Sequence, residues 1–505
     1  MKNSALPTNP AIDSSLLTRR RLLQGVGSLI AVSALPVSRV AAAEESSSSF
    51  IDHGPSVIGK LTTYMSEAAT REIPPEAIEK AKHHILDTIA AMVSGAELAP
   101  AIVAFKYAKA HSGEKSATIV GSNLLCGPAD AALVNGMLAH SDETDDSHAP
   151  SHTHPGCGIV PAALAAGEHY GISGQVFLRA VNLGYDVGTR FPMALGGLAF
   201  QMETHRSSHS IGNNFGAGAA AACAAGLNAK QMCWVIDYAA QQACGSAAWQ
   251  RDTDHVSKAL VFAGRTARNG VTSALMIELG ANGVNDILSG PDNFFDAMTP
   301  KADPSKILEK LGERFEVTRT NIKKWTVGSP IQAPLDALQI LRKRRPFETA
   351  DVQKVVVRVA SSEAKTVNNR DIPGISMQHM MAVMLVDKTA TFHSAHDHAR
   401  MQDPVLLRER AKVVLVPDEE LEALYPERQA IVEVTFTDGT TATERVAAVR
   451  GTAQNPMTRD EVVGKCRDLM SPFLGAEKTD RLIEAILHLE DVKNIRELRP
   501  LLQRD

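Results

Sequence analysis

The densest group of chemically active side chains in this chain is the segment 140–155, HSDETDDSHAPSHTHP. Imidazoles titrate near neutrality and neighbouring carboxylates repel one another, so such crowding costs stability unless hydrogen bonds, cations or a ligand compensate. The segment therefore predicts a site for proton transfer or ligand binding, with a solvated acidic loop as the alternative. Its four histidines and four acidic residues are His140, His148, His152, His154, Asp142, Glu143, Asp145 and Asp146.

The residues on both sides of this segment are apolar and have the period of helices. AALVNGMLAH precedes the segment and GCGIVPAALAAGEHY follows it. Two apolar helices would bury both ends of the segment and hold it as a loop at the edge of a core. This arrangement favours a functional loop over a solvated one.

Length and composition limit the classes of function. The chain has 505 residues, a formal charge of −5, and 44% hydrophobic but only 5% aromatic residues. This length is enough for two domains with a large core. The sequence has no basic patch and no aromatic-interleaved basic stretch, so we expect small molecules and further copies of the chain as partners, and no nucleic acid. The cysteines show no CxxC pair or zinc spacing, so disulfides are permitted but not implied.

Residues 1–43 have the features of an export signal. Residues 18–24, TRRRLLQ, resemble the twin-arginine (Tat) signal, the apolar run 25–35 is too short to span a bilayer, and Ala41-Ala42-Ala43 fits a signal-peptidase site. We expect cleavage before Glu44 and a periplasmic protein without a membrane anchor. A basic tail or an uncleaved anchor is the alternative.

The rest of the chain changes character twice. From about residue 50 to 315 the segments are long, rich in Ala, Gly and Leu, and helical in period, as in PPEAIEKAKHHILDTIAAMVSG and GNNFGAGAAAACAAGL. From about 317 to 451 β-branched runs follow, VQKVVVRVAS, AKVVLVP and the hairpin-like QAIVEVTFTDGTTATERVAAV with Asp438-Gly439 at its turn. After 451 the pattern is helical again, with Thr458 and Thr479 as expected caps and Glu461 completing a capping box with the first.

This pattern predicts a mainly α fold with an α+β insert. The predicted parts are an all-helical domain over 44–316, the insert over 317–451, and a return to the helical domain over 452–505. The small residues of the helical segments should serve close helix packing, because GNNFGAG lacks the preceding strand and the spacing of a phosphate-binding loop.

The order of these segments resembles the MmgE/PrpD family, which includes 2-methylcitrate dehydratase, cis-aconitate decarboxylase and iminodisuccinate epimerase. The loop 140–155 is similar to the family's H-x-x-D-x-D-D-T-H…T-H-P motif. Further similar segments follow in the family's order and spacing, and the resemblance covers the chain after residue 50. These segments are THRSSHSIGNNFGAGAAAA, SKALVFAGRTARNG, NIKKWTVGSPIQAPLDAL, PGISMQHMMAVMLVD and QNPMTRDEVVGKCRDL.

The resemblance implies a homodimer whose active site lies between a large helical domain and a smaller α+β lid, without metal or organic cofactor. Carried over by position, it implies that His154 and His209 act as acid and base. It also implies that two lysines face the substrate, with Lys324 as a rival for the second of them. The catalytic set is thus His154, His209, Lys258 and Lys323, and the substrate-binding set is Glu143, Ser147, His148 and His379.

The chemistry of these residue types agrees with that implication. Removing a proton next to a carboxylate builds an enolate-like dianion, which needs fixed cations and a base that titrates near neutrality. Expulsion of a β-hydroxyl from this species gives dehydration, reprotonation gives epimerisation, and decarboxylation reaches a similar species by loss of CO2. We therefore predict a cofactor-independent lyase for a small di- or tricarboxylic acid, with an epimerase or isomerase as the alternative.

Two other classes of function remain open at this point. One is a metal-dependent enzyme that uses the histidines and carboxylates of the loop as ligands. The other is a periplasmic protein that binds polycarboxylates without turnover.

Three positions depart from the family pattern. Glu143 replaces the usual Asp, Ser147 the usual Thr, and His379 stands where a tyrosine is expected. The third change exchanges a phenol for an imidazole, which can be cationic at pH 7 and bind an additional substrate carboxylate.

Overall fold

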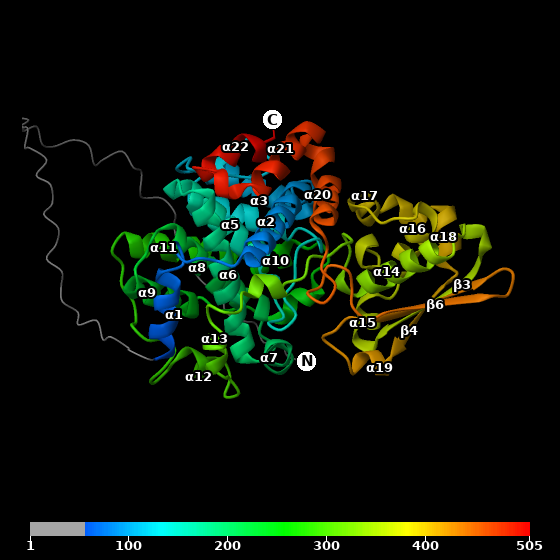
Figure 1. Cartoon of the computed structure of the whole chain (residues 1–505), viewed down its shortest axis with the longest axis horizontal. Helices are drawn as coiled ribbons and strands as arrows, with labels where there is room; N and C mark the ends of the chain where they lie inside the picture. Colours follow the sequence, from blue (N-terminus) through cyan, green and yellow to red (C-terminus); the bar gives the residue numbers. More distant parts are fainter. Residues whose placement is uncertain (1–55, 505) are drawn as a thin grey trace, which may run out of the picture. The chain divides into compact units, whose positions relative to one another are not determined.

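The computed structural model describes residues 56–504 of the chain. Most of these residues are helical and the strands form only two small sheets, so the predicted mainly α class is confirmed (Figure 1). The predicted export signal, residues 1–43, lies outside the described residues. Within 56–504 no single helix is long and apolar enough to cross a membrane. Helices α2 (Pro75–Gly95) and α3 (Ala99–Ala110) together have the length and composition of a membrane span, but they are bent by 86° relative to each other.

The first part of the described chain is a group of helices that share one hydrophobic core. The two helices expected to flank the loop 140–155 are present as α4 (Pro128–Ala139) and α5 (Gly156–Tyr170). A short hairpin of β1 (Ala117–Thr118) and β2 (Leu125–Cys126) precedes them. The other helices are α1 (Val57–Ser66), α6 (Gly174–Leu195), α7 (Gly197–Thr204), α8 (Ser208–Ala224), α9 (Ala229–Gln241), α10 (Val256–Ala259), α11 (Arg265–Glu278), α12 (Phe294–Met298) and α13 (Ser305–Leu308).

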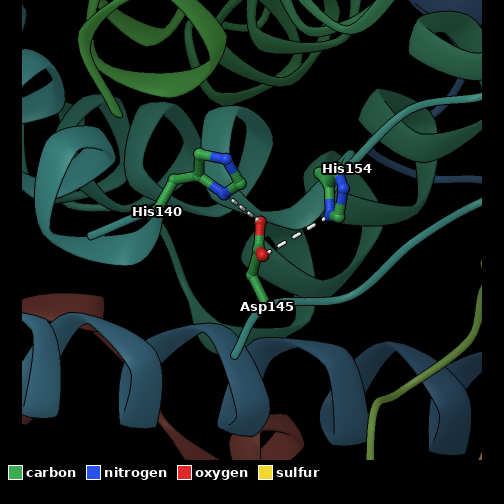
Figure 2. Close-up of side chains that lie close together, drawn as sticks. All are labelled: His140, Asp145 and His154. Atoms are coloured by element: carbon green, nitrogen blue, oxygen red, sulfur yellow. Dashed lines mark hydrogen bonds and ion pairs between the residues drawn. The ribbon is translucent and has the colours of Figure 1, made fainter. Parts of the chain in front are cut away.

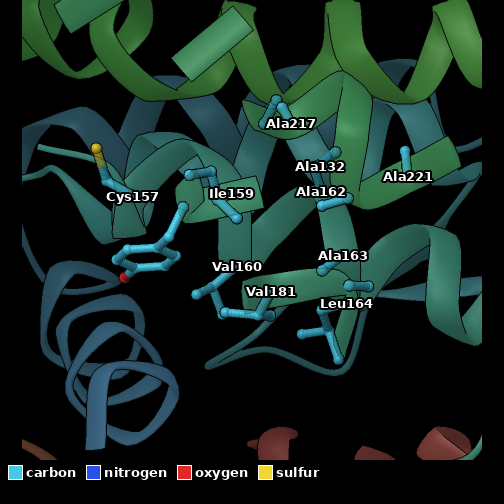
Figure 3. Packing of buried hydrophobic residues seen from close by; sticks show 14 of the residues in the cluster. Ala132, Cys157, Ile159, Val160, Ala162, Ala163, Leu164, Val181, Ala217 and Ala221 are labelled. Carbon is cyan, nitrogen blue, oxygen red and sulfur yellow. The ribbon is translucent and has the colours of Figure 1, made fainter. Parts of the chain in front are cut away.

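Small residues let the central helices approach closely, as the sequence predicted. A Cβ atom on Gly188 of α6 would lie only 2.9 Å from the carbonyl oxygen of Gly212 of α8, and one on Gly216 only 2.7 Å from that of Gly184. Larger side chains would push α6 and α8 apart, so the glycines serve packing rather than phosphate binding. Figure 3 shows the neighbouring core, which includes Ala132 of α4, Ile159, Ala162 and Ala163 of α5, Val181 of α6, and Ala217 and Ala221 of α8.

The part of the chain between residues 325 and 449 has a second hydrophobic core, built around a four-stranded sheet of order β4-β3-β5-β6. Strand β3 (Val352–Ala360) pairs in parallel with β4 (Val413–Asp418) and antiparallel with β5 (Ala430–Phe436). Strand β5 pairs with β6 (Thr441–Val446) in the expected hairpin, whose Gly439 has a φ of 83°. The helices are α14 (Ser329–Arg344), α15 (Ser361–Val367), α16 (Met377–Asp387), α17 (Phe392–His396), α18 (Pro404–Arg410) and α19 (Glu419–Glu422).

The C-terminal helices return to the first core, which includes buried side chains from Val462 to Leu502. They are α20 (Arg459–Leu474), α21 (Ala476–Leu487) and α22 (Arg499–Leu502), and α20 and α21 pack on α2 (Figure 1). The second core lies inside the predicted insert 317–451, whose boundaries at 317 and 451 stay predictions.

One of the two predicted caps is confirmed and the other is wrong. Thr458 accepts a hydrogen bond from the backbone N–H of Glu461, and Glu461 completes the capping box. Thr479, however, is buried inside α21, and the N-cap residue of that helix is Gly475. The positive φ of Gly475, 79°, separates α20 from α21 and lets the second helix begin earlier than expected.

Candidate active site

The loop 140–155 forms one wall of a cavity of about 490 Å³. Residues 147–150 and 152–154 of this loop, His209 at the start of α8, and Lys323 line the cavity on the side of the helical core. Residues 425–428, between α19 and β5, and residues 447–454, after β6, line it on the side of the sheet. A small ligand in the cavity would therefore contact both parts of the chain, and the volume suits an organic acid of a few carbons.

Backbone hydrogen bonds join residues 321 and 322 to the loop 140–155 and to Gly451, and they fix this wall of the cavity. The backbone N–H of Ile322 donates to the carbonyl oxygen of Gly451 at 3.0 Å, and Ser147 exchanges two backbone hydrogen bonds of 2.9 and 2.7 Å with Asn321. A Cβ on Gly451 would lie 1.9 Å from the Ile322 oxygen, so only glycine allows this approach. Lys323 is held between these contacts and is almost fully buried.

His154 is oriented by two neighbours in the loop, of which Figure 2 shows Asp145. Its Nδ1 lies 2.6 Å from the carbonyl oxygen of Asp146 and 3.4 Å from Oδ1 of Asp145. Both partners are acceptors, so Nδ1 carries the proton and Nε2 keeps its lone pair. Nε2 has no hydrogen-bond partner within residues 56–504, and His154 lines the cavity. This tautomer suits a proton acceptor.

Asp145 is buried between two histidines. Its other carboxylate oxygen lies 2.8 Å from Nδ1 of His140, which is also fully buried. Burial alone would raise the pKa of Asp145, but His140 and His154 outweigh it and hold this pKa well below its usual value. Asp145 is therefore a fixed anion that orients His154 and stabilises a positive charge on it.

His209 is the second histidine of the cavity and stacks on His154 at a centroid distance of 5.1 Å. Its ring also stacks on Phe262 at 4.2 Å and meets the edge of Trp249 at 5.5 Å. Burial is the main cause that holds the pKa of His209 well below its usual value, and His152, His154 and Lys258 add to it. The imidazole is therefore neutral at pH 7 and can accept a proton.

A cluster of charged groups lies beside the histidines. Lys258 forms an ion pair with Oε1 of Glu143, which also lies 3.0 Å from Nε2 of His255. Lys323 donates to the Glu143 carbonyl oxygen at 2.7 Å and lies 3.6 Å from Oε2 of its carboxylate. Burial would raise the pKa of Glu143, but Lys258, His255 and Lys323 hold it well below its usual value. Lys258 and Glu143 are in contact next to the cavity without lining it.

The neighbouring Lys324 has different partners. Its Nζ lies 3.2 Å from Oδ1 of Asp336 and 2.7 Å from Oε1 of Gln339, and it lies over the ring of Trp325. Lys323, rather than Lys324, therefore contacts the charged cluster.

The comparisons with known proteins cover nearly the whole described chain. Residues 59–307 match the model of the MmgE/PrpD N-terminal domain, and residues 325–491 match that of the MmgE/PrpD C-terminal domain. The chain belongs to the MmgE/PrpD family. Its curated relatives include a cis-aconitate decarboxylase-like protein of Aspergillus oryzae, 26% identical over 88% of this chain and 97% of the relative. Human cis-aconitate decarboxylase is 26% identical over 89% and 95%, and the enzyme of Aspergillus terreus 24% over 88% and 96%. This membership supports an enzyme of the lyase type.

Two residues that the sequence predicted to bind substrate do not have a free group that faces the cavity. His148 lines the cavity, but both of its ring nitrogens have protein partners, Ser151 at 2.8 Å and Glu316 at 3.3 Å, so it holds the loop. His379 lies in α16, is buried in the second core and does not line the cavity. Burial lowers its pKa to about 4, so this imidazole is neutral at pH 7, contrary to the cation expected from the sequence.

Several residues beside the catalytic set were not assigned a role from the sequence. Phe262 lies in the single π-helical turn Leu260–Gly264 between α10 and α11, and a π turn often marks a functional site. Asp146 accepts hydrogen bonds from Tyr185, His84 and the first backbone N–H of α5. The dense acidic run pointed to Asp145 and Asp146, whereas nothing in the sequence distinguished Trp249 and Phe262 from core aromatics.

Within residues 56–504, the loop 140–155 also contains a group of side chains whose atoms lie close enough together to hold a metal ion. One nitrogen of His140, one of His154 and one oxygen of Asp145 lie within 4.8 Å of one another (Figure 2). The nitrogens that contact Asp145, however, are Nδ1 atoms that donate hydrogen bonds, His140 to Asp145 and His154 also to the Asp146 carbonyl. A metal would require both nitrogens without their protons and would leave that carbonyl without its donor. The arrangement fits the orientation of a catalytic base better than a metal centre.

Proposed function

We propose that this protein is a cofactor-independent lyase for a small di- or tricarboxylic acid, acting through a carbanion or enolate-like intermediate. The observation that carries the proposal is the stacked pair His154 and His209 in the cavity wall beside Lys323. Two imidazoles can move the proton, and Lys323, together with Lys258, which contacts the same Glu143, supplies positive charge for the intermediate. The curated relatives named above are cis-aconitate decarboxylases or resemble one.

In decarboxylation, the bond from carbon to the leaving carboxylate breaks and CO2 departs without the electron pair. The pair stays on carbon, spreads into a neighbouring carboxylate, and is then protonated at carbon by an imidazolium. The anionic substrate would raise the pKa of His209, so that this histidine takes up a proton on binding and can donate it. In dehydration the neutral imidazole instead removes a proton from carbon, and the β-hydroxyl leaves as water after it is protonated.

The first experiment is an assay of the mature protein with cis-aconitate. We expect CO2 and an unsaturated dicarboxylate as products, observed by carbon NMR, at a rate unchanged by a chelator. If cis-aconitate is inert, release of water from 2-methylcitrate or deuterium exchange at the carbon next to a carboxylate would identify the dehydratase or epimerase outcome. Binding of these acids without any turnover or exchange would contradict the lyase proposal and favour a binding protein. Activity that disappears with chelator and returns with one divalent metal would favour the metal-dependent alternative.

We further propose that residues 1–43 direct Tat export to the periplasm. In the double variant Arg19→Lys, Arg20→Lys, we expect the precursor to stay in the cytoplasm, because the paired arginines are the recognised feature of such signals. Cell fractionation would measure the distribution, and mass spectrometry should place the mature N-terminus near Glu44. Arg21→Lys alone is the matched control and should be exported. A periplasmic protein that retains residues 1–43 would contradict the cleavage.

A further inference from the structure

The sheet side of the cavity carries an arginine that the proton chemistry above does not use. Arg428 precedes β5 and lines the cavity, and 30% of its side chain is exposed. Its Nη1 forms an ion pair with Glu363, and its Nη2 donates to the hydroxyl of Tyr425 at 3.0 Å. These contacts leave the Nε–H and one N–H on each Nη without a partner within residues 56–504. A guanidinium that is held by two contacts and keeps three further N–H groups can bind a carboxylate with two hydrogen bonds.

Arg428 acts across the cavity on the loop 140–155. Burial lowers the pKa of His152 to about 4, and the charge of Arg428 is the next largest cause. Burial lowers the pKa of Arg428, but Tyr425 and Glu363, and after them Glu143, outweigh it and raise this pKa. The ring of His152 lies 4.9 Å from that of His209, tilted by 55°, so Arg428 acts on a direct neighbour of the proposed catalytic pair.

Lys258, Lys323 and Arg450 are held more fully by acids of the protein, whereas Arg319 has Glu316 as its acidic partner, as Arg428 has Glu363. Lys258 and Lys323 share the carboxylates of Glu143 and Asp145. Arg450, which also lines the cavity, contacts both oxygens of Glu461. Arg428 has one acidic partner in the structure, and burial raises the pKa of that partner, Glu363, which weakens its hold as a counter-charge.

We propose that Arg428 binds a substrate carboxylate that does not react, and that it thereby selects tricarboxylates over dicarboxylates. The inference rests on the proposed function. The reacting end of the substrate would lie beside Lys323 on the helical side of the cavity, and the remote end would lie beside Arg428 on the sheet side. A substrate that lacks the remote carboxylate would leave the free donors of Arg428 unpaired, which is the basis of strong discrimination between substrates.

Calorimetric titration with three acids tests this role. Propane-1,2,3-tricarboxylate is compared with glutarate and methylsuccinate, each of which lacks one of its carboxylates. For Arg428→Gln we expect the tricarboxylate to bind roughly 10- to 100-fold more weakly, as for the loss of a charge-assisted pair. The dicarboxylate that lacks the carboxylate bound by Arg428 should lose less than about threefold in affinity, so the preference of the wild type for the tricarboxylate over this acid should largely disappear.

Three further variants make the result specific. Arg445→Gln removes an arginine that contacts Gln429 in the same sheet and does not line the cavity, so all three affinities should stay unchanged. Arg319→Gln removes an arginine that lines the cavity and contacts Glu316, so any loss should be similar for all three acids. Glu363→Gln removes the counter-charge of Arg428 and should strengthen tricarboxylate binding selectively. This last variant decides the matter if Arg428→Gln does not fold.

The outcomes separate this inference from the proposed function. If the wild type binds the tricarboxylate and Arg428→Gln binds it equally well, the role of Arg428 is wrong while the lyase proposal stands. The same holds if Arg319→Gln shows the same selective loss, since the effect would then come from the general charge of the cavity. If the wild type binds none of the three acids, both proposals fail.

Discussion

His209→Gln is expected to lower the turnover rate by about 10²- to 10⁴-fold and to leave substrate affinity nearly unchanged. Glutamine keeps the size and a hydrogen-bonding end but cannot accept and return a proton. The ring of His209 is buried between Phe262, Trp249 and His154, so it contributes mainly to proton transfer and little to ground-state binding. A lower kcat with an unchanged Kd would show that the interaction is made in the transition state.

The control for this variant is a histidine of the helical part of the chain that does not line the cavity. His169 in α5 is partly exposed and contacts Ser116, so His169→Gln should retain wild-type turnover. Circular dichroism and thermal unfolding would show whether His209→Gln keeps the fold. A folded His209→Gln protein with full activity on the true substrate would rule out the histidine as the proton carrier.

The long helices and the hairpin could be predicted from the sequence because their signals are local. The period of apolar residues and the turn at Asp438-Gly439 each depend on a few neighbouring positions. Thr479 shows the limit of such signals, because a threonine near a helix start resembles a cap whether or not it is one. The unusual backbone of Gly475 decides where α21 begins, and a glycine by itself does not reveal its φ.

The candidate site was predictable where its residues are close in sequence and otherwise only through the family pattern. The loop 140–155 is conspicuous by itself, since its acids and histidines stand out from an apolar background. No neighbouring residue in the sequence distinguishes Lys323 from Lys324. Their side chains diverge because backbone hydrogen bonds from Asn321 to Ser147 and from Ile322 to Gly451 fix the preceding segment and turn Lys323 toward Glu143. Arg428 is one arginine among many in the sequence, and only the folded cavity places it opposite the catalytic loop.

Lys258→Ala is expected to lower kcat/KM by roughly 10²- to 10³-fold through losses in both binding and turnover. Lys258 lies beside the cavity, so the variant removes a positive charge that attracts the anionic substrate and stabilises the developing negative charge from a short distance. It also leaves the carboxylate of Glu143 with only His255 and the more distant Lys323 as partners. The anion left in excess would repel an anionic substrate, so the effect should exceed the loss of a single contact.

The repulsion between the unpaired Glu143 carboxylate and the substrate can be measured by removing this carboxylate as well. In the double variant Lys258→Ala, Glu143→Gln, part of the lost substrate affinity should return, with a coupling of about 1–2 kcal/mol between the two positions. Lys324→Ala is the matched control, because this neighbouring lysine contacts Asp336 and Gln339 and should leave the kinetics unchanged. Additive effects of the two substitutions would mean that Glu143 does not act through Lys258. Wild-type kinetics in Lys258→Ala would remove the charged cluster from the mechanism and leave the two histidines to act without it.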